Sequence, residues 1–322
     1  MRLCGTNLES GINYWLGVKV EKEGSTTVSC QTLLNSVGNF PPGKIDITEK
    51  EGILELVSSG SKITIPTTPV NEFPSVPYEF PKKSIMVEKK IIDLINRQIV
   101  WTCGGEESKS IFTGVLFLPK EKNLFVVATD GVRLSQKNLS LVSPFPTKVI
   151  IPSKILPEIP KLFSSESIAV EFKEGENQLM FGGGDAVVTT KLLEGEFPDF
   201  EKIIPSSWNT KVVIGKDELQ RALRLSAIFA RDYVVRFEFG GGECRIISEN
   251  PQTGTQKSTV PVKLEGDELE ISFNWRFIND FIGAVGDDEV EFRFVNATSP
   301  GMFVDPKDDS YLHLIMPIRS QE

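Results

Sequence analysis

Histidine is the first residue type to examine for chemistry, and the chain has a single one, His313. One histidine excludes metal sites that need several, and it leaves one candidate base for a histidine-dependent catalytic triad. His313 lies within residues 311–316, a short run of apolar and alternating residues typical of a β-strand. The sequence therefore predicts a structural histidine.

Two other segments could carry chemistry. Three consecutive glycines at 182–184 invite comparison with a phosphate-binding loop, but the G-x-x-x-x-G-K-[ST] pattern is absent and a strand follows, so a hairpin turn is predicted. Asp305, Asp308 and Asp309 could bind a cation, but they lack the glycine and distal glutamate of a calcium loop and surround Lys307. We expect no metal, no cofactor and no enzymatic activity.

Composition limits the class of protein further. The chain has 322 residues, of which 40% are apolar and 25% charged, so a folded core is feasible. Four scattered cysteines form no C-x-x-C pair, which favours idle thiols in a reducing cytosol. Neither a membrane-spanning apolar run nor a secretory signal is recognisable, so a cytoplasmic, nucleoid-associated location is expected.

The charge is divided between predicted helices and the remainder. The net charge of −9 argues against a protein that coats nucleic acid by bulk positive charge. Helices predicted at 87–101, 153–163, 216–229 and 274–285 carry a net charge of +3, which leaves −12 elsewhere. Either these helices face a phosphate backbone or they are ordinary solvated faces. Their basic residues are Lys89, Lys90, Arg97, Lys154, Lys161, Lys216, Arg221, Arg224 and Arg276.

The same order of elements occurs three times: β-rich stretch, polar turn, strand, helix start. The turns fall at Thr6, Thr129 and Ser248, which are 123 and 119 residues apart. This spacing predicts three copies of one α+β domain, at 1–81, 82–206 and 207–322. Only five residues precede Thr6, so the first copy lacks about 40 residues that the others have. The chain is then either a fragment or has a reduced first domain.

The threefold repeat leaves two motifs unexplained. In VATDGVRL (127–134), Asp130 and Gly131 suit a turn with positive φ, but the turn does not account for Arg133 and Leu134. The segment LIMPIR (314–319) is unusually apolar for the end of a chain, so it either completes a sheet or lines a groove for a partner peptide.

These motifs, with GEFPDFEKIIP (195–205) and the threefold repeat, resemble the bacterial sliding clamp family, the β subunit of DNA polymerase III. The resemblance covers nearly the whole chain. It implies an α+β fold of three clamp domains, each with helices backed by antiparallel sheet. Two chains would close head to tail into a homodimeric ring around duplex DNA, without catalytic activity. The partners implied are duplex DNA, the polymerase III catalytic subunit, the clamp loader and other proteins with clamp-binding motifs.

The resemblance also implies site residues. A peptide groove between the second and third domains would have Leu134, Ile203 and Met316 as apolar walls, with Arg133 offering hydrogen bonds at the rim. The full groove set is Phe112, Thr129, Gly131, Val132, Arg133, Leu134, Pro198, Lys202, Ile203, Phe277, Leu314, Met316, Pro317, Ile318 and Arg319. At the ring interface Ile63 and Ile65 would face Ile228 and Phe229 of the second chain. Lys109 joins the DNA-facing set because it matches a basic position in a loop that touches DNA.

Departures from the family pattern leave alternatives open. Val132 replaces a larger residue, Lys202 stands where arginine is common, Glu106 lies beside Lys109, and residues 320–322 extend far enough to cover part of the groove. The helix expected near 29–38 carries no lysine or arginine. A clamp-like peptide-binding module that closes no ring is therefore one alternative, and an enzyme on a β-rich scaffold is another.

Overall fold

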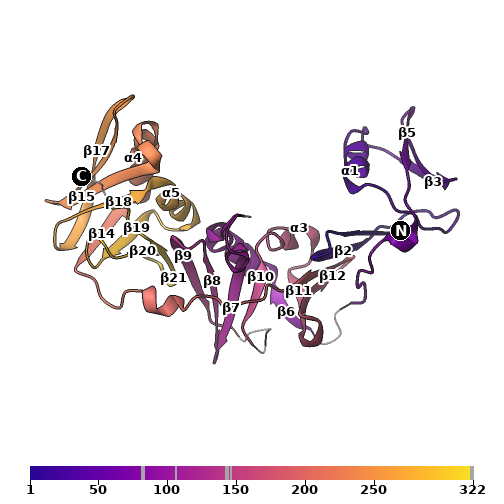
Figure 1. Ribbon diagram of the computed structural model, residues 1–322, viewed down its shortest axis with the longest axis horizontal. Helices are drawn as coiled ribbons and strands as arrows, with labels where there is room; N and C mark the ends of the chain where they lie inside the picture. Colours follow the sequence, from indigo (N-terminus) through magenta and orange to yellow (C-terminus); the bar gives the residue numbers. More distant parts are fainter. Residues whose placement is uncertain (81–83, 106, 142–144, 146, 320–322) are drawn as a thin grey trace.

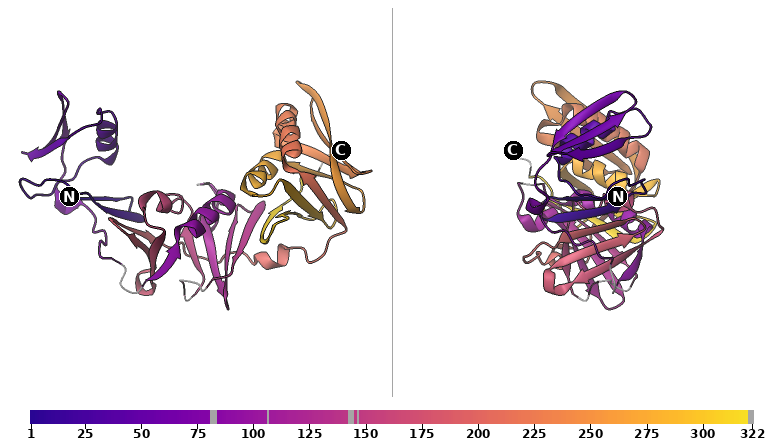
Figure 2. Two further views of the ribbon diagram at one scale, coloured as in Figure 1. Left: turned by 180° about the vertical axis from the view of Figure 1, so that it is seen from behind. Right: turned by 90° about the vertical axis from the view of Figure 1, so that its right-hand side faces the viewer.

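A computed structural model describes residues 1–80, 84–105, 107–141, 145 and 147–319. These residues form three sheets arranged along an arc, and helices α1, α3, α4 and α5 lie on its concave side (Figure 1; Figure 2, left). None of the helices within these ranges is long and apolar enough to cross a membrane. The predicted α+β class, with helices backed by antiparallel sheets, is confirmed.

The first sheet joins the start of the chain to its centre. Its strands, in spatial order, are β1 (Arg2–Thr6), β2 (Ser10–Trp15), β13 (Ala186–Lys191), β12 (Gln178–Gly183), β11 (Ser167–Lys173) and β6 (Ile85–Glu88). Neighbouring strands are antiparallel, and Ile12 of β2 pairs with Val188 of β13. The predicted glycine turn is shorter than expected, because Gly182 and Gly183 belong to β12 and only Gly184 and Asp185 turn.

A small separate sheet stands beyond this junction (Figure 1). It consists of β3 (Asp46–Lys50), β4 (Ile53–Ser58) and β5 (Ser61–Pro66), with α1 (Cys30–Gly38) beside it. The Ser29 side chain caps α1 by accepting from the Thr32 amide, as short polar side chains do at helix starts. The core here is only Leu54, Leu56 and Ile65 with a few half-buried neighbours.

The largest sheet joins the centre of the chain to its end. Its strands are β10 (Val149–Pro152), β7 (Gly114–Lys120), β8 (Asn123–Thr129), β9 (Arg133–Leu139), β21 (Asp308–Ile315), β20 (Gly301–Asp305), β19 (Glu289–Phe294), β14 (Thr210–Gly215), β17 (Gly254–Gly266), β16 (Glu243–Asn250), β15 (Val234–Gly240) and β18 (Leu269–Asn274). The step from the central to the C-terminal part is the antiparallel ladder of β9 with β21.

The helices agree with the predicted ranges, with one exception. They are α2 (Lys89–Gln98), α4 (Lys216–Phe229) and α5 (Trp275–Ala284), the last capped by the Asn274 side chain. The helix expected at 153–163 is wrong for most of its length, since only α3 (Ile159–Leu162) forms and turns precede it. Pro157 and Pro160 explain this, because proline lacks the amide that a helix interior needs.

The β9–β21 ladder has two different faces, because successive residues of a strand point to opposite sides. Leu139, Tyr311 and Ile315 belong to the core beneath the helices. Leu134 and Leu314 belong to a second cluster on the other side, together with Leu116, Val127, Ile150, Phe200, Met302 and Val304. One face of the ladder therefore packs under the helices and the other carries the Leu134–Leu314 cluster. Residues of the candidate site lie on both faces.

Candidate functional site

The turn between β8 and β9 is built by its own polar side chains. The Thr129 hydroxyl accepts from the Gly131 amide at 3.0 Å and donates to the Arg133 carbonyl at 2.6 Å. One Asp130 carboxylate oxygen accepts from the amides of Val132 and Arg133 at 2.9 and 3.0 Å. Gly131 has φ +95°, which confirms the predicted positive φ. The turn presents Val132 to solvent.

The end of the chain lies against this turn. Leu314 of β21 is directly opposite Leu134 of β9. Beyond the strand, the Met316 amide donates to the Val132 carbonyl at 3.0 Å, and the Ile318 amide donates to the Ser272 carbonyl of β18 at 2.8 Å. The two motifs that the sequence left unexplained therefore meet at one place.

The apolar residues of this place divide into a buried floor and exposed side chains. Leu134 and Leu314 are each 2% exposed, so they form a packed floor rather than the walls expected for Leu134. Val132, Ile203 and Met316 are 48, 48 and 43% exposed. We call these three residues the apolar rim. Ile203 and the exposed Pro198 are carried by a segment whose Phe197, Phe200 and Ile204 pack on the floor cluster.

The remaining predicted groove residues surround the rim. The Phe112 ring lies beneath Gly131, 3.5 Å from where a side-chain carbon would be. Pro317 and Ile318 are half-buried and Arg319 is exposed. Lys202 is exposed and pairs with Asp199 at 2.7 Å. Residues 320–322, expected to cover part of the groove, lie outside the described residues, as does Glu106.

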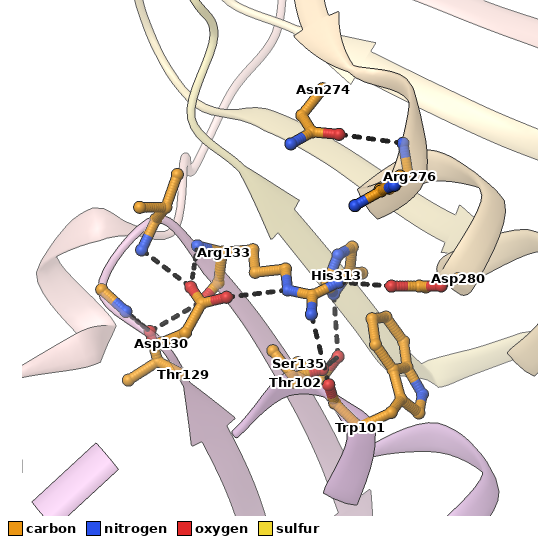
Figure 3. A network of polar contacts seen from close by, with 12 residues as sticks. Trp101, Thr102, Thr129, Asp130, Arg133, Ser135, Asn274, Arg276, Asp280 and His313 are labelled. Atoms are coloured by element: carbon orange, nitrogen blue, oxygen red, sulfur yellow. Dashed lines mark hydrogen bonds and ion pairs between the residues drawn. The ribbon is translucent and has the colours of Figure 1, made fainter. Parts of the chain in front are cut away.

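Arg133 makes several contacts within the chain. Its side chain is only 11% exposed and lies on the helix side of the ladder, opposite to Leu134. The guanidinium donates to Asp130 at 2.9 Å, to Asp280 of α5 at 2.7 Å and to the Trp101 carbonyl at 3.3 Å (Figure 3). It also lies 4.3 Å from the centre of the Phe277 ring. Three of its five N–H donors are thus engaged within the chain, so the prediction that it offers hydrogen bonds to a peptide remains a prediction for the other two.

His313 is fully buried at the same junction. Its Nδ1 is 2.8 Å from the Ser135 hydroxyl, which is 2.7 Å from the Thr102 hydroxyl (Figure 3). Burial, and then the nearby Arg133, hold the pKa of His313 well below its ordinary value. Trp101 and Phe281 lie against the imidazole with ring centres at 4.9 and 5.8 Å. The predicted structural role is confirmed, because substrate cannot reach a ring with no exposed surface.

A second ion pair crosses the same ladder. The ammonium of Lys137, on β9, donates to Asp308 of β21 at 2.8 Å, and Gln98 of α2 donates to the same carboxylate at 3.3 Å. Burial alone would raise the pKa of Asp308, but the hydrogen bonds from Lys137 and Ser310 outweigh it and the pKa is lowered. Asp308 is thus engaged in a contact within the chain.

The predicted DNA-facing cations differ in their exposure and in whether they pair with other groups of the chain. Lys89 and Lys216 are half-buried and donate to the carbonyls of Phe163 and Val285. Lys90, Lys161 and Arg221 pair with nearby glutamates. Arg97, Lys109, Lys154, Arg224 and Arg276 are exposed. Of these, Arg97, Arg224 and Arg276 have no ion pair with any residue in the described ranges.

The four predicted ring-interface residues also differ in how much of each side chain is exposed. Ile228 is 66% exposed and Phe229 is half-buried. Ile65 is only 2% exposed because it points into the small core with Leu54 and Leu56, and Ile63 packs against the same core. The expectation that the Ile65 side chain faces a second chain is therefore wrong for this structure, and Ile63 offers only part of its surface.

Sequence reasoning missed the partners that engage Arg133. Asp130 was assigned only a turn role, and Trp101 and Asp280 were not singled out. One signal was available, since alternation along a strand requires Arg133 and Leu134 to point to opposite faces. Within the described ranges, no three His, Cys, Asp or Glu side chains are arranged to hold a metal ion.

The fold and site together define a class of protein. Sheets joined edge to edge place helices with exposed cations on one side and an apolar rim on the other, around a histidine that no substrate can reach. These features are typical of a protein that works by binding along its surfaces.

Comparison with known proteins identifies the family. The family models of the DNA polymerase III beta subunit match its central domain to residues 86–199 and its C-terminal domain to residues 201–319. The chain therefore belongs to the bacterial DNA polymerase III beta subunit family, the beta sliding clamps, which are non-catalytic processivity factors of DNA replication.

Individual relatives agree with this assignment. The beta sliding clamp of Staphylococcus aureus is 28% identical over 309 residues, which is 94% of this chain and 82% of that protein. The DNA polymerase III beta chain of Streptococcus pneumoniae superposes with a TM-score of 0.89 at 27% identity, covering 99% of this chain and 89% of that one. The beta subunit of Thermotoga maritima superposes with a TM-score of 0.91 at 24% identity, covering 99% and 88%.

Proposed function

We propose that this chain encircles duplex DNA as a head-to-tail homodimer and tethers partner proteins through the apolar rim. The partners would be the polymerase III catalytic subunit, the clamp loader and other proteins with a short clamp-binding motif, acting in the bacterial cytoplasm. The observation that carries the proposal is the exposure of Val132, Ile203 and Met316 around the buried leucine floor of the β9–β21 ladder. Large exposed apolar side chains grouped over a rigid sheet are typical of peptide-binding sites.

The proposal also covers the division of the chain. We infer domain boundaries near residues 81 and 206. The first lies outside the described residues, and the second lies between the 3-10 turn Phe200–Ile203 and β14, where irregular chain links the two parts. The equal spacing of the three polar turns supports this division.

DNA binding would rest on the exposed arginines of the concave side. Arg97 and Arg224, without ion pairs among the described residues, leave their charge available to phosphates. A ring binds DNA by enclosure, so a weak and sequence-independent attraction suffices and permits sliding. The net charge of −9 is compatible with this, because the acidic residues can lie on other faces.

The apolar rim can be tested with one substitution and a matched control. Met316→Asp places a charge on the rim, and Leu34→Asp places the same charge on another exposed apolar side chain, in α1. We expect Met316→Asp to weaken binding of a labelled peptide with two adjacent large apolar residues at least tenfold, while Leu34→Asp leaves it unchanged. Fluorescence anisotropy measures this, and equal affinities for the wild type and Met316→Asp would contradict the rim assignment.

A second function is favoured by the N-terminal part. Helix α1 has no charged residue, Leu34 on it is 64% exposed, and Ile65 is buried in the chain's own core. A peptide-binding module that closes no ring would fit these features. Light scattering over a concentration series separates the two candidates, because a stable dimer retained on circular DNA supports the ring and a persistent monomer supports the module.

A further inference from the structure

Some charged side chains around the apolar rim have an oppositely charged partner within the chain, and others do not. Acidic side chains of the elements around it already pair with cations: Asp130 and Asp280 with Arg133, Asp199 with Lys202, and Glu201 with Lys120. Two exposed arginines, Arg276 and Arg319, have no carboxylate partner within the ranges that the structure describes. Anion-binding capacity thus remains on this side of the molecule after internal pairing.

Arg276 is held in place by an exposed tyrosine. The guanidinium carbon of Arg276 lies 3.6 Å from the centre of the Tyr233 ring. In this arrangement one face of the guanidinium is covered, and the N–H groups at its edges stay open. A guanidinium fixed in this way has lost part of its rotamer freedom before an anion arrives, which favours binding of a planar carboxylate.

The backbone that presents Tyr233 is unusual. Asp232 and Tyr233 are two successive non-glycine residues with positive φ, at 52° and 66°. This conformation is strained for residues with a side chain, and such strain gathers at functional sites. Asp232 itself faces Arg231 at 3.4 Å, so it leaves Arg276 unpaired. The strained turn holds the ring outward, where Tyr233 is 44% exposed.

The arginine–tyrosine pair is connected to the rim through the C-terminal tail and β18. The tail that leaves Val132 through Met316 reaches Ser272 of β18 through the Ile318 amide. Two residues further along β18, Asn274 caps α5 by accepting from the Arg276 amide (Figure 3). The next residue, Phe277, lies against Arg133. A peptide that follows the tail from the rim toward β18 would therefore approach Arg276 and Arg319.

We propose that Arg276, held by Tyr233, and Arg319 bind aspartate or glutamate side chains that flank the apolar anchor of a partner peptide. This inference rests on the proposed peptide-binding function and assigns its specificity. Arg276 was expected to face DNA, but its neighbours favour the peptide. It lies two residues after the capping residue Asn274, near the tail contact, whereas the unpaired Arg97 lies in the last turn of α2 and Arg224 lies in the middle of α4.

The test uses two fluorescein-labelled peptides that share one apolar anchor and differ only in two flanking residues, Asp-Asp or Asn-Asn. Fluorescence anisotropy at low salt gives the affinity of each for the full chain. We expect the acidic peptide to bind roughly fivefold more tightly, because one exposed ion pair contributes about 1 kcal/mol. The preference should be reduced in Arg276→Gln and in Tyr233→Ala, since Arg319 remains in both, and retained in full in the matched control Arg224→Gln.

Each other outcome contradicts a different statement. Equal affinity of both peptides for the wild type, or an acidic preference that is undiminished in Arg276→Gln, would overturn this inference while leaving the rim intact. Failure of both peptides to bind would overturn the proposed function and the inference with it. If Arg276→Gln weakens retention on circular DNA and leaves the peptide preference unchanged, the arginine serves DNA and the inference is wrong.

Discussion

The guanidinium of Arg133 on β9 donates to the carboxylate of Asp280 on α5 at 2.7 Å, across the junction between the central and C-terminal parts (Figure 3). Asp130 holds the same guanidinium from its other side. The neighbouring Leu134 packs on the opposite face of the sheet, beneath the apolar rim. Two adjacent residues therefore serve the junction and the binding surface separately.

Removing Arg133 should weaken the junction more than removing Asp280. Arg133→Ala leaves Asp130 and Asp280 without their cation at a largely buried place, so we expect a loss of about 3 kcal/mol. Asp280 is 42% exposed, so Asp280→Asn should cost only about 1 kcal/mol. Urea unfolding followed by the fluorescence of Trp101, whose ring lies 5.1 Å from Arg133, measures both. Lys202→Ala, which breaks an exposed pair, is the control and should change little.

Stability should fall between pH 7 and pH 5 because of His313. Its pKa in the folded chain is depressed, so the unfolded chain binds the proton first and stability is lost as pH falls below about 6.5. The groups that face the imidazole are Arg133, Ser135, Trp101 and Phe281, and among them only Arg133 is charged.

The assignment of this pH effect is simple because the chain has one histidine. The slope should approach about 1.4 kcal/mol per pH unit in the wild type and should nearly vanish in His313→Gln. Urea midpoints at several pH values give the comparison. An equal slope in both proteins would show that other groups are responsible. The lowered pKa of Asp308 acts only at more acidic pH, below the ordinary range of a carboxyl group.

The sequence predicted the elements better than the contacts between them. The helix predicted at 216–229 matches α4 to the residue, because apolar residues at helical spacing are a local signal. The role of Arg133 depends on Asp280, which is 147 residues away, so no local pattern could reveal it. Burial of Ile65 likewise depends on where β4 and α1 lie. Long-range pairing decided these two outcomes, whereas the shortened helix at 153–163 has a local cause in its two prolines.

Gly131 should tolerate no side chain at low cost. Its φ of +95° is strained for any residue with a Cβ, although the nearest atom, of the Phe112 ring, would be at ordinary contact distance. We expect Gly131→Ala to cost about 1–2 kcal/mol and to weaken peptide binding by displacing Val132. Gly283→Ala in α5 is the matched control, because its Cβ would meet open space and alanine favours helix. Thermal unfolding and peptide anisotropy on both variants check this.

Attraction to DNA should depend on which arginines are free rather than on how many cations the helices carry. Arg97→Gln and Arg224→Gln each remove a charge without an ion-pair partner in the described part of the chain. Each should therefore reduce the salt dependence of DNA binding by up to about one unit of log affinity per log salt for each phosphate that the arginine neutralises. Lys90→Gln is the matched control, because its ammonium is paired with Glu88 and contributes less. Retention on nicked circular DNA over a salt series gives these slopes. If all three variants lower the slope equally, internal pairing does not select the phosphate-binding cations, and the net charge of the concave side would determine the attraction instead.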